Sequence, residues 1–400
     1  MPEAARTSAA KADEAPRSVD LALQGGGSHG AFTWGVLDAL LEDGRIALDG
    51  ASGTSAGAMN AVVLAHGLAR ARQDGLKGQD VHEAARAALK RFWEGVGLLG
   101  SFTTGLPLPA TQAVVSWFSQ WLTPAQVNPL GVNPLRRLLL DQVDFDLLDS
   151  VHAMKVFVCA TNVRTGGGEV FSGKRLTVDA VMASACLPTL FKPVEIAGEL
   201  YWDGGYSGNP ALYPLIYNTR SNDVVLVQIN PVAVPFKADA DAQDIMERVN
   251  EITFNAPLLA EFRAIEFVAR LLDEGRLDPG RYRKMLLHRV DGGAALRAFG
   301  TASKMRADIV FLHRLFEIGR QTGQHWLKTH FRNLGVRSTA IEAPLTAKNG
   351  ERAGATPGPT MIPTASSARS LPARFPRARS TRTRSCSPST TSRPGRRCIF

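Results

Sequence analysis

Long apolar runs are missing from this chain. No segment reaches the roughly 18 consecutive apolar residues that would indicate a membrane-spanning helix. Residues 1–17 are rich in Ala, Glu, Lys and Arg and lack the apolar core of a signal peptide. We therefore expect neither an integral membrane protein nor export by the Sec route.

Cysteine is scarce as well. The 400 residues include four cysteines, Cys159, Cys186, Cys386 and Cys398, which have neither CxxC spacing nor the spacing of a zinc site. The first two lie in apolar segments, so we predict free thiols and a cytoplasmic location. Cys398 is the third residue from the end, whereas a prenylation motif needs cysteine as the fourth residue from the end. We therefore expect no prenyl anchor. The cysteines therefore predict no disulfide and no zinc framework.

The formal net charge is +9, and the excess of positive charge is confined to the end of the chain. Residues 344–400 contain ten Arg and one Lys against one Glu, so the rest is close to neutral. The same residues include eight Pro and eight Ser without apolar periodicity, which is typical of disorder. Such a tail could contact anionic lipid, but charge runs are usually only solvated, and a frameshifted gene would give the same composition. We expect no nucleic-acid partner.

The body of the chain has the pattern of an α/β protein. Hydrophobic residues make up 44% and charged residues 21%, which is typical of a chain that forms a core. Short apolar runs alternate with helical periods from residue 19 onward, which predicts βαβ units and a mainly parallel sheet. We expect strands at 20–24, 46–51, 156–161 and 224–229, and helices at 31–41, 58–68, 81–93, 178–186, 240–272 and 302–331.

The same pattern predicts the domain organisation. We expect a disordered extension at 1–17, a catalytic domain at 18–232, a helical region at 233–343 packed on that domain, and a disordered basic tail at 344–400. An apolar insert at about 95–130, rich in Gly, Pro and aromatic residues, interrupts the alternation. It is either a flexible lid that touches lipid or a set of aromatic side chains packed on the sheet.

A run of glycines follows the first expected strand, in the segment Gly25-Gly26-Gly27-Ser28-His29-Gly30. The spacing satisfies GxGxxG, and Asp49 lies where a dinucleotide-binding fold places its ribose-binding acid. Asp49, however, is followed by a second glycine motif instead of ending a strand. Three consecutive glycines can also aim successive amides at one anion, because they lack Cβ atoms. The loop therefore fits either nucleotide binding or the stabilisation of an oxyanion.

The second glycine motif, Gly53-Thr54-Ser55-Ala56-Gly57, has the GxSxG pattern of a nucleophile elbow. Ser55 would project its hydroxyl from a strand-to-helix turn, and the helix N-terminus would favour developing negative charge. A hydroxyl nucleophile also needs a base. Asp203, in Trp202-Asp203-Gly204-Gly205, is the best candidate if its surroundings disfavour its charge. An isolated Asp-Gly pair is more often a surface turn.

These motifs occur together with a third block, Ala183-Ser184-Ala185-Cys186-Leu187-Pro188, which is followed by Phe191 and Pro193. In order and spacing, the set resembles the bacterial patatin-like phospholipase family over about residues 19–232. The resemblance implies a three-layer α/β/α sandwich with Ser55 as nucleophile and Asp203 as base. It also implies Gly25, Gly26 and Gly27 as oxyanion-hole donors, with Gly30, Gly53, Gly57, Pro188, Gly204 and Gly205 in supporting roles.

The reaction implied by the resemblance is hydrolysis of an acyl ester in a phospholipid or related lipid, through an acyl-enzyme and without metal or cofactor. The expected partners are this lipid and, at most transiently and peripherally, a membrane surface. Two positions depart from the family pattern: Gln24 stands where many members have an acid, and His29 where Arg or Lys is common. Both departures bear on headgroup preference more than on activity, because the expected donors are backbone amides.

Two alternatives stay open at this point. The first is a Ser-His-Asp esterase of the α/β-hydrolase type, in which the catalytic histidine follows the serine and the acid in the chain. His29 and His66 come too early for this order, whereas four later histidines satisfy it: His288, His313, His325 and His330. None of these histidines has a distinctive local motif. The second alternative is a nucleotide-binding module without catalysis, which would use the GxGxxG loop alone.

Overall fold

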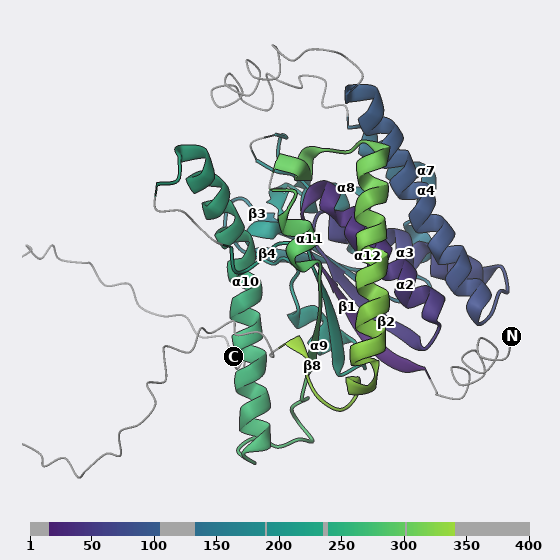
Figure 1. Cartoon of the computed structure of the whole chain (residues 1–400). Coiled ribbons are helices and arrows are strands. Elements are labelled where there is room, and N and C mark those ends of the chain that lie inside the picture. Colours follow the sequence, from purple (N-terminus) through teal and green to yellow (C-terminus); the bar gives the residue numbers. More distant parts are fainter. Residues whose placement is uncertain (1–15, 105–132, 189, 235–238, 301, 341–400) are drawn as a thin grey trace, which may run out of the picture. The chain divides into compact units, whose positions relative to one another are not determined.

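The computed structural model in Figure 1 describes residues 16–104, 133–188, 190–234, 239–300 and 302–340. All of them belong to the first of two units of the chain, Met1–Ala347. The predictions for residues 1–15, for the part of the insert at 105–130 and for the basic tail lie outside the described residues.

A single sheet organises the described residues, with the strand order β5-β6-β3-β2-β1-β7-β8 and with β4 paired to β3. The pairs that join β3, β2, β1, β7 and β8 are parallel, whereas β4, β5 and β6 pair in antiparallel fashion. The sheet is thus mainly parallel, as the alternation of strands and helices predicts. The strands are β1 (Arg17–Leu23), β2 (Ile46–Gly53), β3 (Lys155–Asn162), β4 (Gly168–Phe171), β5 (Val194–Ile196), β6 (Glu199–Asp203), β7 (Asp223–Gln228) and β8 (Leu286–Asp291).

Helices connect these strands and flank the sheet. The α-helices are α2 (Gly30–Asp43), α3 (Ala56–Gln73), α4 (Gln79–Thr104), α7 (Pro134–Gln142), α8 (Val178–Ser184), α9 (Tyr213–Asn218), α10 (Ala242–Asp273), α11 (Gly293–Arg297) and α12 (Ile309–His330). Short 3₁₀ turns include η1 (Gly27–His29), η2 (Asp146–Asp149), η3 (Gly173–Arg175), η4 (Gly204–Tyr206), η5 (Ala302–Met305) and η6 (Phe331–Asn333).

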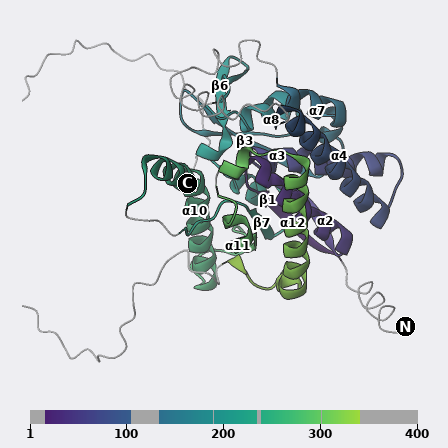
Figure 2. The same ribbon diagram turned by 45° about the horizontal axis from the view of Figure 1, so that its top comes forward.

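Two cores on opposite faces of the sheet make the fold a three-layer α/β/α sandwich. Successive side chains of a strand point to opposite faces. In β1, Leu21 and Leu23 join the larger core with α2, α3, α4 and α12, whereas Ala22 joins a second core with Leu212 of α9 and Phe262 of α10. Figures 1 and 2 show the resulting layers, with α10 on the far side of the sheet from α2 and α12.

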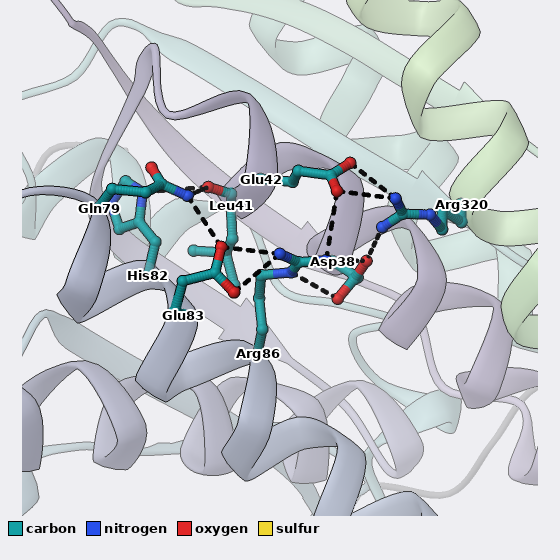
Figure 3. Close-up of polar contacts among 8 residues, drawn as sticks. All are labelled: Asp38, Leu41, Glu42, Gln79, His82, Glu83, Arg86 and Arg320. Carbon is teal, nitrogen blue, oxygen red and sulfur yellow. Dashed lines mark hydrogen bonds and ion pairs between the residues drawn. The ribbon is translucent and has the colours of Figure 1, made fainter.

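The C-terminal region contributes more than helices to this fold. β8 extends the sheet beyond β7 in parallel register, from Asp223↔Leu286 to Gln228↔Asp291. The expected boundary at residue 232 therefore does not end the sheet, and the region 233–343 is not wholly helical. The region is also tied to the first helices by charge, since Asp38 of α2 pairs with Arg86 of α4 and with Arg320 of α12 (Figure 3).

Helix α4 is longer than the sequence predicts. A helix is expected over 81–93 and an insert from about 95, but α4 continues to Thr104. Three glycines that suggested the insert lie close to other elements: a Cβ on Gly95 would meet Leu138, one on Gly97 would meet Ile309, and one on Gly100 would meet Ala307. The packing of these glycines against other elements explains why α4 continues past residue 93. Tertiary packing here outweighs the low helix propensity of glycine.

None of the described helices has both the length and the apolar character needed to span a bilayer. The two described cysteines, Cys159 and Cys186, are buried free thiols, as expected from their apolar segments.

Candidate active site

Ser55 lies in a sharp turn between the last residue of β2, Gly53, and the first residue of α3, Ala56. Its backbone has φ 55° and ψ −121°, which places a residue with a side chain in the left-handed region. Such strain costs energy and is found mainly where the surrounding structure enforces it, often at functional sites. The turn also puts Ser55 at the N-terminus of α3, where the helix dipole favours negative charge.

The glycines around Ser55 allow the strand and helix to pack without space for a side chain. A Cβ on Gly57 would lie 2.0 Å from the carbonyl oxygen of Leu23 at the end of β1. A Cβ on Gly53 would lie 2.5 Å from the carbonyl oxygen of Gly57, and one on Gly30 would lie 2.6 Å from the Cβ of Ala56. The three positions therefore require glycine for close approach, which is the structural reason for the GxSxG spacing.

Asp203 is the last residue of β6, and the sheet register brings it level with the serine. β6 pairs Asp203 with Ala160 of β3, and β3 pairs Val158 with Gly53 of β2. Because Ala160 is two residues beyond Val158 and Ser55 is two residues beyond Gly53, the two candidate side chains come to the same end of the sheet. The Ser55 side chain lies near enough to Asp203 to lower the pKa of its carboxyl group.

Burial tunes the acidity of Asp203. The residue is 1% exposed, and burial raises the pKa of its carboxyl group to about 7, although the hydrogen bond from the Gly205 amide and the nearby Ser55 side chain lower it. The Gly205 amide donates to Oδ1 of Asp203 at 2.7 Å. A carboxylate of this pKa is a much stronger base than an ordinary aspartate and is still largely ionised slightly above neutral pH.

The glycine loop lies directly beside the candidate nucleophile, Ser55. A Cβ on Gly25 would lie 2.8 Å from the Cβ of Ser55. The amide of Gly25, however, donates to Oδ1 of Asn209 at 2.7 Å, so it is not free to bind an oxyanion. The amides of Gly26 and Gly27 make no hydrogen bond to another described residue. Of the three amides expected to bind an oxyanion, the first is therefore engaged by a buried asparagine, and an oxyanion role for all three stays a prediction.

Gln24 holds the loop in place from the end of β1. Its side-chain oxygen accepts hydrogen bonds from the amides of Ile229 at 3.0 Å and Asn230 at 2.9 Å. Its side-chain nitrogen donates to the carbonyl oxygen of Asn209 and to Oδ1 of Asn255, both at 3.3 Å. Gln24 is fully buried, and a carboxylate there could not donate to these two acceptors. The amide thus fits this chain where an acid is common in the family.

The end of α8 positions both candidate residues. The hydroxyl of Ser184 accepts a hydrogen bond from the amide of Ser55 at 2.9 Å, and the carbonyl of Cys186 accepts one from the amide of Asp203 at 2.8 Å. Pro188 lies in the half-buried turn that follows. Ser184 belongs to the third block of the sequence motifs, and no role for it is predicted from the sequence.

The Asp-Gly-Gly turn is also closely packed. A Cβ on Gly204 would lie 2.0 Å from the carbonyl oxygen of Cys159 in β3, and one on Gly205 would lie 2.2 Å from the ring of Phe254 in α10. The turn that carries Asp203 is therefore enclosed by the sheet on one side and by the C-terminal region on the other. It is a buried turn, unlike the surface turn that an isolated Asp-Gly pair suggests.

No histidine is hydrogen-bonded to Ser55 or Asp203 among the residues that the structure describes. His29 contacts the hydroxyl of Ser303 at 2.7 Å, and burial, helped by the charge of Lys304, lowers its pKa to about 4. His288 lies between Asp223, at 2.8 Å, and Thr339, at 3.1 Å. Asp223 begins β7, at the end of the parallel sheet away from the nucleophile turn.

Asp49, the acid that would bind the ribose in a dinucleotide-binding fold, holds a turn of the backbone in this structure. Asp49 accepts hydrogen bonds on its carboxylate from the amides of Arg220 and Ser221, at 2.5 and 3.2 Å, and so fixes the turn before β7. In the described part of the chain, no group of three or more His, Cys, Asp or Glu side chains is arranged to hold a metal ion.

Comparisons with known proteins agree with the motifs. A model of the patatin-like phospholipase family matches residues 21–216. Among solved structures, the chain is similar to VipD from Legionella pneumophila, with 16% identity, 76% of this chain and 67% of that chain covered, and a TM-score of 0.31.

A second similar structure is ExoU of the type III secretion system of Pseudomonas aeruginosa, solved in complex with SpcU. It shares 12% identity with a TM-score of 0.25, and the match covers 78% of this chain but only 54% of ExoU. No curated protein matches the chain. The family match runs from within β1 through the glycine loop and the turn at Ser55 to beyond Asp203, so residues 21–216 form a patatin-like phospholipase domain.

Proposed function

We propose that the protein is a lipid acyl hydrolase that cleaves carboxylic ester bonds of phospholipids or related lipids. The family match supports lipid hydrolysis in general. The observation that carries the finer proposal is the meeting, at one end of the sheet, of Ser55, on a strained turn, and Asp203, a buried carboxyl group with a pKa of about 7. No histidine is needed to connect them.

The proposed reaction has two halves. In the first, the Ser55 hydroxyl oxygen attacks the ester carbonyl carbon while its proton passes to the Asp203 carboxylate. The tetrahedral intermediate then collapses, the acyl–oxygen bond to the alcohol breaks, and Asp203 returns the proton to the leaving alkoxide. In the second half, water attacks the acyl-enzyme and gives its proton to Asp203, which passes it to Ser55 as the fatty acid leaves.

The negative charge that forms on the carbonyl oxygen needs fixed donors. The amides of Gly26 and Gly27 are the candidates, because they lie in the loop beside Ser55 and have no partner among the described residues. Preorganised amide donors of this kind typically contribute about 10²–10³ in rate. The N-terminus of α3 favours the same charge.

A substrate that resides in a bilayer requires contact with its surface, so we also propose transient peripheral membrane binding. Its structural support is the turn after α8, which exposes Leu190 and Phe191 and adjoins the residues that hold Ser55 and Asp203. Co-flotation of the purified protein with phospholipid vesicles tests this contact, and absence of co-flotation at low salt would contradict it. The cytoplasmic location stays a prediction.

The main test uses a fluorophosphonate probe, which labels activated serines, together with fatty-acid release from phospholipid vesicles. Ser55→Ala and Asp203→Asn are compared with the wild type, and Ser150→Ala is the matched control because Ser150 precedes β3 at the strand end away from the site. We expect labelling and release in the wild type and the control only. A wild type that neither labels nor releases fatty acid, although folded by circular dichroism, would overturn the proposal.

A further inference from the structure

Lys304, in the short turn η5, reaches the glycine loop from outside the segment that matches the family. Its ammonium group donates a hydrogen bond to Oδ1 of Asn230 at 2.8 Å. The side-chain nitrogen of Asn230 in turn donates to the carbonyl oxygen of Gly25 at 2.6 Å. A chain of two hydrogen bonds therefore joins Lys304 to the first residue of the loop.

The other two loop glycines also contact this arrangement. A Cβ on Gly26 would lie 3.5 Å from Oδ1 of Asn230, the atom that accepts the bond from Lys304. A Cβ on Gly27 would lie 2.3 Å from the carbonyl oxygen of Lys304 itself. The backbone of Lys304 thus packs on Gly27, and its ammonium group is bonded to the Asn230 oxygen that lies next to Gly26. These two glycines carry the amides that the structure leaves available for an oxyanion.

The loop's own ionisable side chain carries no charge at neutral pH. His29 is 3% exposed and packs against Phe299 and Phe311, and burial together with the Lys304 charge lowers its pKa to about 4. Lys304 is half-buried, and a charge in such a place is screened less than one in water. Its electrostatic effect on the loop is correspondingly larger than that of a surface lysine.

We propose that Lys304 is a positioning residue for ester cleavage: acting through Asn230 it holds the glycine loop beside Ser55, and its positive charge favours the oxyanion bound by the Gly26 and Gly27 amides. This inference rests on the proposed function. It means that the C-terminal region completes the site, in line with the contacts that Phe254 makes with Gly205 and Asn255 with Gln24.

The experiment compares Lys304→Met, which removes the charge and the donor, with Lys304→Arg, which keeps both. Lys328→Met is the control, since it removes the same charge from an exposed position in the last turn of α12. The substrate is a neutral short-chain ester below its solubility limit, so that membrane binding does not enter. We expect kcat to fall about tenfold in Lys304→Met with KM changed less than about twofold, because a transition-state interaction is lost. Lys304→Arg and Lys328→Met should keep most of the wild-type kcat.

An NMR titration of the His29 imidazole gives a second readout that does not depend on activity. Loss of the neighbouring positive charge should raise the His29 pKa in Lys304→Met, and not in Lys328→Met, while burial keeps it below its ordinary value. Should Lys304→Met fail to fold, Lys304→Gln takes its place, because the amide keeps a donor and removes the charge.

The outcomes separate the two proposals. A wild type no more active than Ser55→Ala would refute the proposed function and this inference with it. An active wild type whose folded Lys304→Met variant keeps its kcat, even though the His29 pKa has moved, would refute the role of Lys304 alone. A lowered kcat that Lys304→Arg does not restore would also overturn it, because steric disturbance would then explain the loss.

Discussion

The hydroxyl oxygen of Ser184, at the last residue of α8, accepts the amide hydrogen of Ser55 at 2.9 Å. This bond holds the residue whose backbone lies in the left-handed region. Two residues later the Cys186 carbonyl accepts the amide of Asp203. One short segment therefore fixes the backbone of both the candidate nucleophile and the candidate base, although they come from different strands.

Removing the Ser184 hydroxyl should therefore loosen the nucleophile. In Ser184→Ala the Ser55 amide loses its acceptor in a buried site, and we expect the free energy of unfolding to fall by about 1 kcal/mol. We expect kcat for a soluble ester to fall by about three- to tenfold, since small misplacements at a reacting centre are costly. Kinetics and urea titration measure the two effects, with Ser150→Ala as control. A wild-type kcat in Ser184→Ala would contradict the positioning role.

Gly57 should tolerate no side chain. A methyl group there would lie 2.0 Å from the Leu23 carbonyl oxygen, so β1 and α3 would have to separate. We expect Gly57→Ala to lose activity and roughly 3 kcal/mol of stability. The control is Gly167→Ala, where the nearest heavy atom to the added Cβ is Thr165 Oγ1 at 3.4 Å, an ordinary contact. Similar melting temperatures for the two variants would show that the close approach is not required.

The ionisation of Asp203 should appear in the pH dependence of the reaction. Only the carboxylate accepts the serine proton, so kcat/KM for a soluble ester should fall on the acid side with an apparent pKa of about 7. A histidine would ordinarily titrate nearby, but burial lowers the pKa of His29, His66 and His82. The acid limb should therefore persist in His66→Asn and His82→Asn. A rate that stays constant down to pH 5 would show that the group that accepts the serine proton does not have the raised pKa of Asp203.

The parts of the fold that the sequence predicts are those with local patterns. Short apolar runs indicate β1, β2, β3 and β7, and glycines at fixed spacing indicate the two loops. β8 is different, because its sequence Leu-Leu-His-Arg-Val-Asp places His288 in a buried strand. Burial of that histidine depends on Asp223 and Thr339, which are distant in sequence, so no local pattern could indicate it.

The site shows the same division. Ser55 and Asp203 belong to motifs and could be named as candidates from the sequence, whereas Asn209, Asn230 and Lys304 are linked to the glycine loop by hydrogen bonds across the fold. A single asparagine or lysine outside a motif has no property that distinguishes it from a surface residue. The Gly25 amide is an example. The glycine motif suggests that this amide is a free hydrogen-bond donor, but in the structure it donates to the side chain of Asn209.

Asp38 should be important for holding the C-terminal helix on the first part of the fold. Its carboxylate, 6% exposed, pairs with Arg86 of α4 at 2.7 Å and with Arg320 of α12 (Figure 3). Asp38→Ala leaves two partly buried guanidinium groups without this partner, and we expect a loss of about 2–3 kcal/mol by urea unfolding. The exposed pair of Arg137 and Asp141, 4.0 Å apart, provides the control: Asp141→Ala should change stability by less than about 1 kcal/mol. Equal losses in the two variants would contradict the prediction.

Asp20 should make the protein less stable as the pH rises. It is fully buried in β1, and burial raises its pKa to about 7 even though Thr219 donates to its carboxylate. The folded protein then binds a proton that the unfolded chain has lost above about pH 4, so the Asp20 contribution to stability falls between about pH 4 and pH 7. Asn is neutral throughout and retains a carbonyl oxygen for Thr219. We therefore expect the stability of Asp20→Asn relative to the wild type to increase on the order of 2 kcal/mol between pH 5 and pH 8, as measured by urea unfolding. The test uses the change of this stability difference with pH, because any pH-independent cost of the amide side chain then cancels. A stability difference between the variant and the wild type that does not change with pH would mean that Asp20 is ionised in the folded protein at pH 5.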